Sequence, residues 1–300
     1  MKKNWFWGVI SIIFISWIGN TIYFESKQLK EPVILNTYID VPSSENTIFT
    51  LLYITNKNEV VELDSLLVDG YTYSNERNYF PWFGEPSAQS YKQEFTHHFL
   101  KEALFTLSED DIKRLHESIQ TDNVLARFTN GQVIPLKVDK LNFTFYKDDQ
   151  SIFSHASSFS SNAGIQGSLL EVVESANMEP IELPEVIREN MDLKVMLLKS
   201  KSANFVDVKK ILKTDWEDID APLDIEINWP LQIEEGDKVG LIYKLKDNVE
   251  DVKYIEATHN WIGKKINGQQ SSYGIYVQVD PTLTQNQVNT IVKKARGEEK

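Results

Sequence analysis

Hydrophobic and polar residues follow two different patterns along this chain. Residues 5–24 form an apolar run that contains no charged residue. Twenty residues at the helical rise of about 1.5 Å per residue span about 30 Å, the thickness of a membrane's hydrocarbon core. Trp5, Trp7 and Tyr23 lie near the ends of the run, where aromatic rings favour the headgroup region. The run therefore predicts a transmembrane signal-anchor helix.

A cleaved signal peptide is the alternative interpretation of this run, because Lys2 and Lys3 precede it at the extreme N-terminus. The exit from the run favours an uncleaved anchor. Gly19-Asn20-Thr21 is a poor small-x-small cleavage site, and bulky Ile22 follows it directly. With lysines on the N-terminal side, the positive-inside rule predicts a cytoplasmic tail at residues 1–4 and an extracytoplasmic location for residues 25–300.

Beyond the run, apolar residues gather in short segments of strand length, rich in Val, Ile, Thr, Tyr and Phe. Turn pairs with glycine separate several of them, such as Asp69-Gly70, Asn130-Gly131, Glu235-Gly236 and Asn267-Gly268. The pattern predicts strands at 33–41, 47–55, 60–68, 124–128, 133–138, 141–146, 193–198, 205–212, 223–229, 239–246, 252–258 and 273–279. Many short strands with frequent turns are typical of β-sandwiches.

The predicted fold is mainly β, with the N-terminal transmembrane helix, two Ig-like β-sandwich domains and a short C-terminal helix. A polar stalk at 25–31 leads to a first domain at 32–176 and a second at 181–283. Thr284 is a helix-capping residue type, so residues 284–300 are predicted as a terminal helix and charged tail. The similarity of residues 51–58 to residues 195–202 leaves open whether the two domains are repeats.

Two segments are harder to assign. In residues 91–107 the apolar positions fit a helix, but the second half also alternates as a strand, which we favour. Residues 151–168 are rich in serine and are predicted as a long loop.

Composition narrows the class of function. The chain carries a net charge of −13, which disfavours nucleic acid as a partner because phosphate backbones repel acidic surfaces. It contains no cysteine, so disulfides, thiolate metal ligands and cysteine nucleophiles are excluded.

Residue patterns for chemistry are weak. Glu94, His98 and Glu102 have metal-ligand spacing only if their segment is helical, and the acidic run 215–224 lacks the glycine-centred spacing of a calcium loop. Solvated polar surface is the better interpretation of both. The sequence has no Gly-x-Ser-x-Gly elbow and no phosphate-binding glycine loop. We therefore assign no catalytic, cofactor-binding or metal-binding residue and expect a protein that is not an enzyme.

One aromatic stretch is the candidate binding site. Tyr79, Phe80, Trp82 and Phe83 are close enough in sequence to bind a glycan or a protein partner from an exposed loop. The competing interpretation places these rings in the core, and we expect Trp82 to be mostly buried.

Leu52–Asn58, the hairpin sequence Phe128-Thr-Asn-Gly131 and the N-terminal run together resemble signal-anchored envelope proteins of spore-forming Gram-positive bacteria. The resemblance implies a location rather than an activity. The expected function is thus a single-pass cell-membrane protein, anchored by residues 5–24, whose extracytoplasmic β domains bind a protein or cell-wall partner. The alternative is a membrane-tethered hydrolase acting on cell-wall or peptide substrates.

Overall fold

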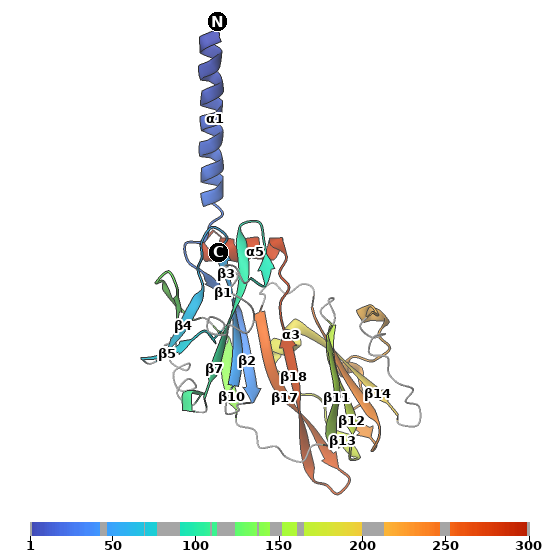
Figure 1. The fold of residues 1–300 in the computed structure, drawn as a ribbon. Helices are drawn as coiled ribbons and strands as arrows, with labels where there is room; N and C mark the ends of the chain where they lie inside the picture. The colour runs from blue at the N-terminus through green and yellow to red at the C-terminus, as the bar shows by residue number, and fades with distance from the viewer. Residues whose placement is uncertain are drawn as a thin grey trace.

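The computed structural model shows a mainly β body with one long helix rising from it (Figure 1). The structure describes residues 2–42, 47–68, 70–76, 91–108, 110–112, 124–136, 138–144, 152–160, 165–199, 213–246 and 253–298. A short helix lies near the C-terminus, so the mainly β class and both terminal helices are as predicted.

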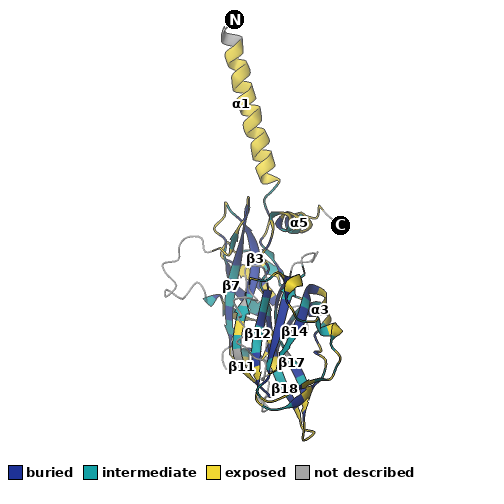
Figure 2. Cartoon of the chain, turned by 90° about the vertical axis from the view of Figure 1, so that its right-hand side faces the viewer, coloured by how far each residue is buried: buried dark blue, intermediate teal, exposed yellow. Residues whose placement is uncertain are grey.

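Helix α1 (Lys2–Glu25) stands clear of the body, and its described side chains are exposed from Trp5 onward (Figure 2). Residues Trp5–Glu25 are long and apolar enough to cross a membrane. An apolar helix that finds no protein surface to pack against loses the burial that normally stabilises such side chains in water. The exposed run is therefore suited to lipid.

Two sheets enclose the first core. One has the strand order β1 (Val33–Ile34), β3 (Thr47–Asn56), β7 (His98–Leu107) and β6 (Gln93–Glu94). The other has the order β5 (Tyr71–Ser74), β4 (Leu63–Val68), β8 (Val124–Phe128) and β9 (Val133–Pro135). Within the first of these sheets, Phe49 on β3 stacks on its pairing partner Phe105 on β7, with ring centroids 5.4 Å apart.

Two further sheets enclose the second core. The larger has the order β10 (Lys140–Thr144), β2 (Asn36–Pro42), β17 (Lys253–Lys265), β13 (Ala176–Met178) and β15 (Leu231–Ile233), and β18 (Gln270–Val279) also pairs with β17. The smaller has the order β11 (Phe153–Ser160), β12 (Ile165–Val172), β16 (Lys238–Leu245) and β14 (Met191–Leu198). Trp261, fully buried, stacks on Phe153 between these sheets.

The larger sheet contributes side chains to both cores. In β2, Tyr38 packs in the second core while its neighbour Ile39 packs in the first, and in β17 Tyr254 and Ile255 divide in the same way. Successive side chains of a strand point to opposite faces, so this sheet forms a wall between the cores. The predicted division at residues 176–181 does not describe these cores, because β2 pairs with β17 and β12 pairs with β16 across it.

Several local predictions are confirmed. Hairpins β8–β9 and β17–β18 turn at the predicted pairs, and Gly131 and Gly268 adopt positive φ angles of 86° and 83°. Residues His98–Leu107 form a strand, as favoured, and not a helix. Helix α5 (Gln285–Ala295) begins after Thr284, whose side chain accepts a hydrogen bond from the Gln287 N–H group.

Three predictions were wrong or incomplete. The serine-rich segment holds β11 and β12, in which exposed serines such as Ser154 and Ser158 alternate with Phe153 and Phe159. The predicted strand at 223–229 is a short 3₁₀ turn, Asp224–Glu226, with Ile225 exposed. The possible repeat would make β3 and β14 equivalent strands. However, β3 lies inside its sheet and β14 lies at the edge of another, so the two strands hold different positions. The predicted strand at 205–212 lies outside the described residues.

Gly167 on β12 marks a close approach to the two strands that flank it, β11 and β16. A Cβ atom at this position would lie 2.5 Å from the Leu241 carbonyl oxygen and 2.6 Å from the Phe159 ring. We expect Gly167→Ala to lower the free energy of unfolding by about 1–3 kcal/mol, because backbone must shift to admit the methyl group. Gly240→Ala is the matched control, since its nearest neighbour, Met196 Cβ, is 3.4 Å away. Equal urea midpoints for the two variants would contradict the close approach.

Candidate functional site

The aromatic candidates Tyr79, Phe80, Trp82 and Phe83 lie outside the described residues. Their assignment as a partner-binding or glycan-binding site, and the expected burial of Trp82, both stay predictions.

The weak metal patterns are not assembled into a site. Glu94 pairs with Lys57, and Glu102 pairs with Lys92 at 3.3 Å, so these carboxylates are turned toward lysines. Most of the acidic run 215–224 is exposed, with Asp224 partly buried. Across the described ranges, no three His, Asp or Glu side chains converge in a way that would hold a metal ion.

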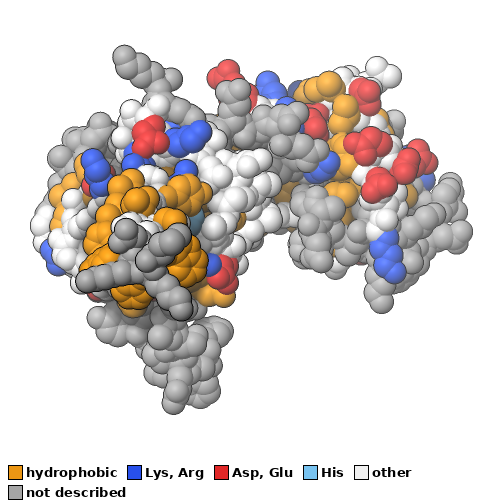
Figure 3. All heavy atoms as spheres, turned by 90° about the horizontal axis from the view of Figure 1, so that it is seen from above, with side chains coloured by type: hydrophobic (Ala, Val, Ile, Leu, Met, Phe, Trp, Pro, Cys, Tyr) orange, Lys and Arg blue, Asp and Glu red, His pale blue; other side chains and the backbone are white. Residues whose placement is uncertain are grey.

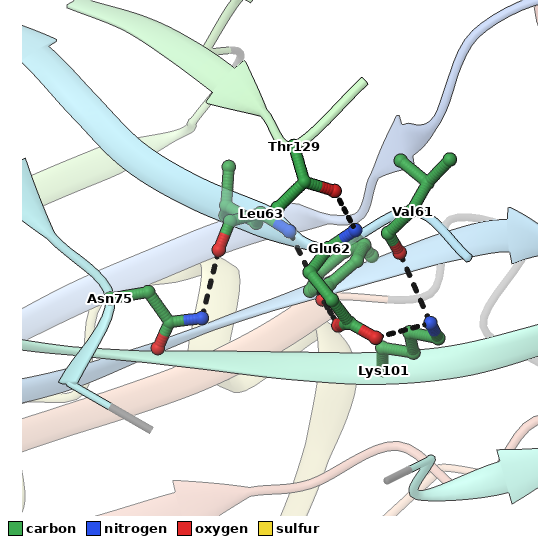
Figure 4. Close-up of polar contacts among 7 residues, drawn as sticks. Val61, Glu62, Leu63, Asn75, Lys101 and Thr129 are labelled. Carbon is green, nitrogen blue, oxygen red and sulfur yellow. Dashed lines mark hydrogen bonds and ion pairs between the residues drawn. The ribbon is translucent and has the colours of Figure 1, made fainter. Parts of the chain in front are cut away.

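One of the most buried charged groups of the described body is Lys101 on β7, whose side chain is 2% exposed. Its Nζ donates hydrogen bonds to the Val61 carbonyl oxygen at 3.1 Å and to Glu62 Oε1 at 2.6 Å (Figure 4). The Glu62 side chain is 25% exposed, so the lysine is enclosed while its partner reaches solvent. A buried ammonium group is stable only when it is paired and hydrogen-bonded in this way.

Tyr53 on β3 completes the cluster. Its fully buried hydroxyl donates to Glu62 Oε2 at 2.6 Å and accepts the Leu63 N–H group at 3.2 Å. Both carboxylate oxygens of Glu62 are therefore engaged, one by an ammonium group and one by a phenol. We define Lys101, Glu62 and Tyr53 as the lysine cluster.

Hydrogen bonds from neighbouring segments surround the lysine cluster. Glu62 donates its N–H to Thr129 Oγ1 at 3.0 Å, and Thr129 returns its own N–H to the Glu62 carbonyl oxygen at 2.9 Å. Asn75 bridges the Leu63 carbonyl oxygen at 2.8 Å and the Leu104 N–H group at 3.1 Å. The cluster thus joins the two sheets of the first core. Its charged groups already satisfy one another, which is the geometry of a structural ion pair and not of a proton donor poised for substrate.

A second polar cluster lies on β17 and β18. Glu256 accepts hydrogen bonds from the Tyr254 hydroxyl at 3.0 Å and from the Tyr276 hydroxyl at 2.8 Å, and Gln278 donates to the Tyr254 oxygen at 3.1 Å. Burial raises the pKa of Glu256, although the two hydroxyl groups oppose that rise. Burial likewise raises the pKa of Tyr254 and of Tyr276. Tyr276 is 45% exposed, so this cluster reaches the surface.

The joint between α1 and the body is closely packed. Asn56 accepts the Leu29 N–H group at 2.8 Å and donates to the Leu29 carbonyl oxygen at 2.9 Å, so it pairs with that peptide as a neighbouring strand would. The Arg296 guanidinium donates to the Ser26 carbonyl oxygen. Gln132 donates to the Lys30 carbonyl oxygen at 3.0 Å. Residues 26–31, predicted as a polar stalk, are therefore held against the body.

Two histidines lie at this joint. His97 contacts the rings of Tyr23 and Phe24 at the end of α1, at centroid distances of 6.4 Å and 5.9 Å. His98, which is 2% exposed, lies opposite Asn56 in the pairing of β7 with β3. Burial lowers the pKa of His98 to about 4, although the Lys27 carbonyl group favours the charged form.

The surface of the body that surrounds α1 is mixed in charge. Seen along the helix in Figure 3, the hydrophobic side chains gather at α1, and lysine or arginine and acidic side chains lie around it. The exposed acids Asp215, Glu217, Asp218 and Asp220 belong to the acidic run 215–224. The hydrophobic part of this surface therefore lies at the joint with α1.

Known proteins give no family assignment. The chain matches no protein-family model and no curated protein. The features of the body that bear on function are the lysine cluster, the Glu256 cluster and the joint. Sequence reasoning missed all three, because their residues come from segments far apart in the chain and no local motif marks them.

Proposed function

We propose that the protein is a single-pass membrane protein whose extracytoplasmic β body binds a protein or cell-wall partner and catalyses no reaction. The observation that carries the proposal is α1, an exposed apolar helix of membrane-spanning length that is attached to the body by a hydrogen-bonded joint. In this proposal the tail at residues 1–4 is cytoplasmic and the β sandwiches, which we take to be Ig-like, lie in the cell envelope.

The joint favours an anchor over a cleaved signal peptide. Cleavage near residues 21–25 would remove Tyr23 and Phe24, the ring partners of His97. Ser26 and Leu29 would then lie close to a new N-terminus, although the side chains of Arg296 and Asn56 bond to their backbone groups. A leader that is discarded needs no such contacts.

The two polar clusters support a binding role rather than catalysis. The charged groups of the lysine cluster satisfy one another, and the Glu256 carboxylate accepts hydrogen bonds from two tyrosines. The alternative, a membrane-tethered hydrolase, has no residue set in its favour in the ranges that the structure describes.

We expect the full-length protein to stay in the membrane fraction through high salt and an alkaline wash. Ile12→Arg with Ile15→Arg should release it, because each arginine at a helix centre costs about 2.5–3.5 kcal/mol on insertion scales. Ile12→Leu with Ile15→Leu is the matched control and should stay bound. Export of a soluble protein trimmed near residues 21–25 would overturn the anchor.

Topology is tested separately. Protease added to cells stripped of their wall should digest residues 25–300 while a cytoplasmic marker stays intact. Full protection of the body would place it in the cytoplasm and reject the proposed location.

A further inference from the structure

Strand β18 (Gln270–Val279) has an unusual edge. Its ten residues, Gln-Ser-Ser-Tyr-Gly-Ile-Tyr-Val-Gln-Val, include no charged residue and no proline, and its pairing with β17 runs without a bulge. Exposed edges are normally protected by shortness, charge, proline or bulges. Those devices are present elsewhere: β1 and β6 have two residues each, β9 ends in Pro135, β14 carries Asp192 and Lys194, and β11 has a bulge at His155.

The backbone directions of this hairpin follow from two hydrogen bonds. In β17, the Lys265 N–H group bonds across the turn to Gln269, whereas the Ile262 carbonyl oxygen accepts the Glu179 N–H group on the other side. Odd-numbered residues of β17 therefore face β18. Because their partners in the register are odd-numbered too, the even-numbered residues of β18 direct their N–H and C=O groups away from β17.

Part of this outer edge is already occupied by a side chain. The Tyr243 hydroxyl, from β16, donates to the Tyr276 carbonyl oxygen at 3.5 Å and accepts the Gln278 N–H group. A residue of a neighbouring strand would bond to these two backbone groups. The Tyr243 hydroxyl therefore takes the place of a neighbouring strand at this position. Toward the hairpin turn, Ser272 and Gly274 follow on the same edge, and no strand of the described chain pairs there.

We propose that the outer edge of β18 binds an extended segment of a partner protein as an added strand. This inference rests on the proposed binding function and names the surface that carries it. Strand addition supplies affinity through main-chain hydrogen bonds, and alternate side chains supply specificity.

Membrane geometry argues against a second copy of this chain as the occupant. The β17–β18 hairpin extends lengthwise away from α1 in both views (Figures 1 and 2). Two copies in one membrane have their twofold axis along the membrane normal. Antiparallel pairing of two β18 edges needs a twofold axis perpendicular to the strands. A twofold axis parallel to the strands places each residue opposite the same residue of the other copy, so that N–H groups face N–H groups. The membrane therefore rules out the antiparallel ladder, and the arrangement that it allows forms no ladder.

The side chains beside the edge define the segment. On one face, Tyr273 and Ile275 extend the second core, so alternate residues of the segment should be apolar. On the other face, Gly274 leaves room beside Tyr276, whose hydroxyl bonds to Glu256. The net charge of −13 disfavours an acidic segment. The best-fitting segment alternates apolar residues with polar or basic ones.

Amide hydrogen exchange of the full-length protein in micelles tests the open edge first. The amides of Ser272 and Gly274 should exchange quickly, and those of Tyr273 and Ile275, which bond to β17, should exchange slowly. Equal protection of all four amides would mean that the edge is already covered and would overturn the proposal.

Binding is tested with displayed random peptides of strand length, panned on the same full-length protein. Selected peptides should show the alternating pattern and should protect Ser272 and Gly274 from exchange. Ser272→Pro removes an outward N–H group without breaking a bond to β17, so it should weaken binding about tenfold. Ser272→Ala is the matched control and should bind within about twofold of the parent.

Tyr243→Phe provides a readout that does not depend on the proline variant folding. Loss of the hydroxyl frees the Tyr276 and Gln278 backbone groups, so peptide affinity should rise several-fold and protection should extend to residue 278. Peptides that bind equally to the parent, Ser272→Pro and Tyr243→Phe would overturn the proposal. That result would leave the membrane anchor, which the wash and protease experiments test, unaffected.

Discussion

Glu62→Leu is expected to lower the free energy of unfolding by about 3–5 kcal/mol. Lys101 is 2% exposed, and the substitution removes the carboxylate that pairs with its ammonium group. The Tyr53 hydroxyl loses its acceptor at the same time. The buried Lys101 ammonium group would then keep only the Val61 carbonyl oxygen as a hydrogen-bond partner in this cluster. Urea unfolding of the full-length protein in micelles, followed by tryptophan fluorescence, measures the loss.

A double variant separates the pair from its surroundings. Glu62→Leu combined with Lys101→Met replaces both charges by apolar groups of similar size, and should recover most of the lost stability. The exposed pair Lys264–Glu179 is the matched control, because its side chains are 62% and 39% exposed. Glu179→Leu should change stability by less than about 1 kcal/mol. Equal effects of Glu62→Leu and Glu179→Leu would contradict a structural role for the lysine cluster.

Acid is expected to destabilise the body through His98. The pKa of this imidazole falls from its ordinary value of 6.5 to about 4 in the folded protein, so the unfolded chain binds the proton more tightly. The stability that neutral His98 permits is therefore complete above pH 6.5 and is lost as the pH falls toward 4. The full loss is about 3.5 kcal/mol, at about 1.4 kcal/mol per pKa unit.

His98→Leu should remove this acid dependence, and the difference between variant and parent is the quantity to measure between pH 7 and pH 4. Glu256 and Asp224, whose pKa values burial raises, contribute in the opposite sense in both proteins and cancel from the difference. His97→Gln is the control and should keep the acid-dependent loss. An unchanged pH profile in His98→Leu would show that the imidazole is not the responsible group.

The sequence predicted the elements that local chemistry determines. The uncharged run 5–24, the Asn130-Gly131 and Asn267-Gly268 turns and the Thr284 cap each carry their signal within a few residues, and each is present. It failed where tertiary contacts decide. The serines of β11 looked like a loop because composition does not show that Phe153 and Phe159 alternate with them against a partner strand.

The site was less predictable than the fold for the same reason. Lys101 lies between Leu100 and Glu102 in its strand, and nothing in this local sequence indicates that its partner is Glu62, which lies just before β4 of the other sheet. The Asn56 contact with Leu29 joins the end of β3 to a linker that the sequence predicted as a free stalk. The aromatic residues 79–83 had the clearest local signal, and they stay a prediction.

The pairing of β2 with β17 sets the order in which an exported chain would fold. Asn36 meets Lys253 in that pairing, so the first core lacks a wall until the last third of the chain has crossed the membrane. Contacts so distant in sequence slow folding, because the intervening loop must close before they form. Until then, the apolar faces of the N-terminal strands would stay exposed at the membrane surface. If the body is exported as we propose, its folding would depend on chaperones of the outer compartment or on fast translocation, and truncation before β17 would leave no foldable half.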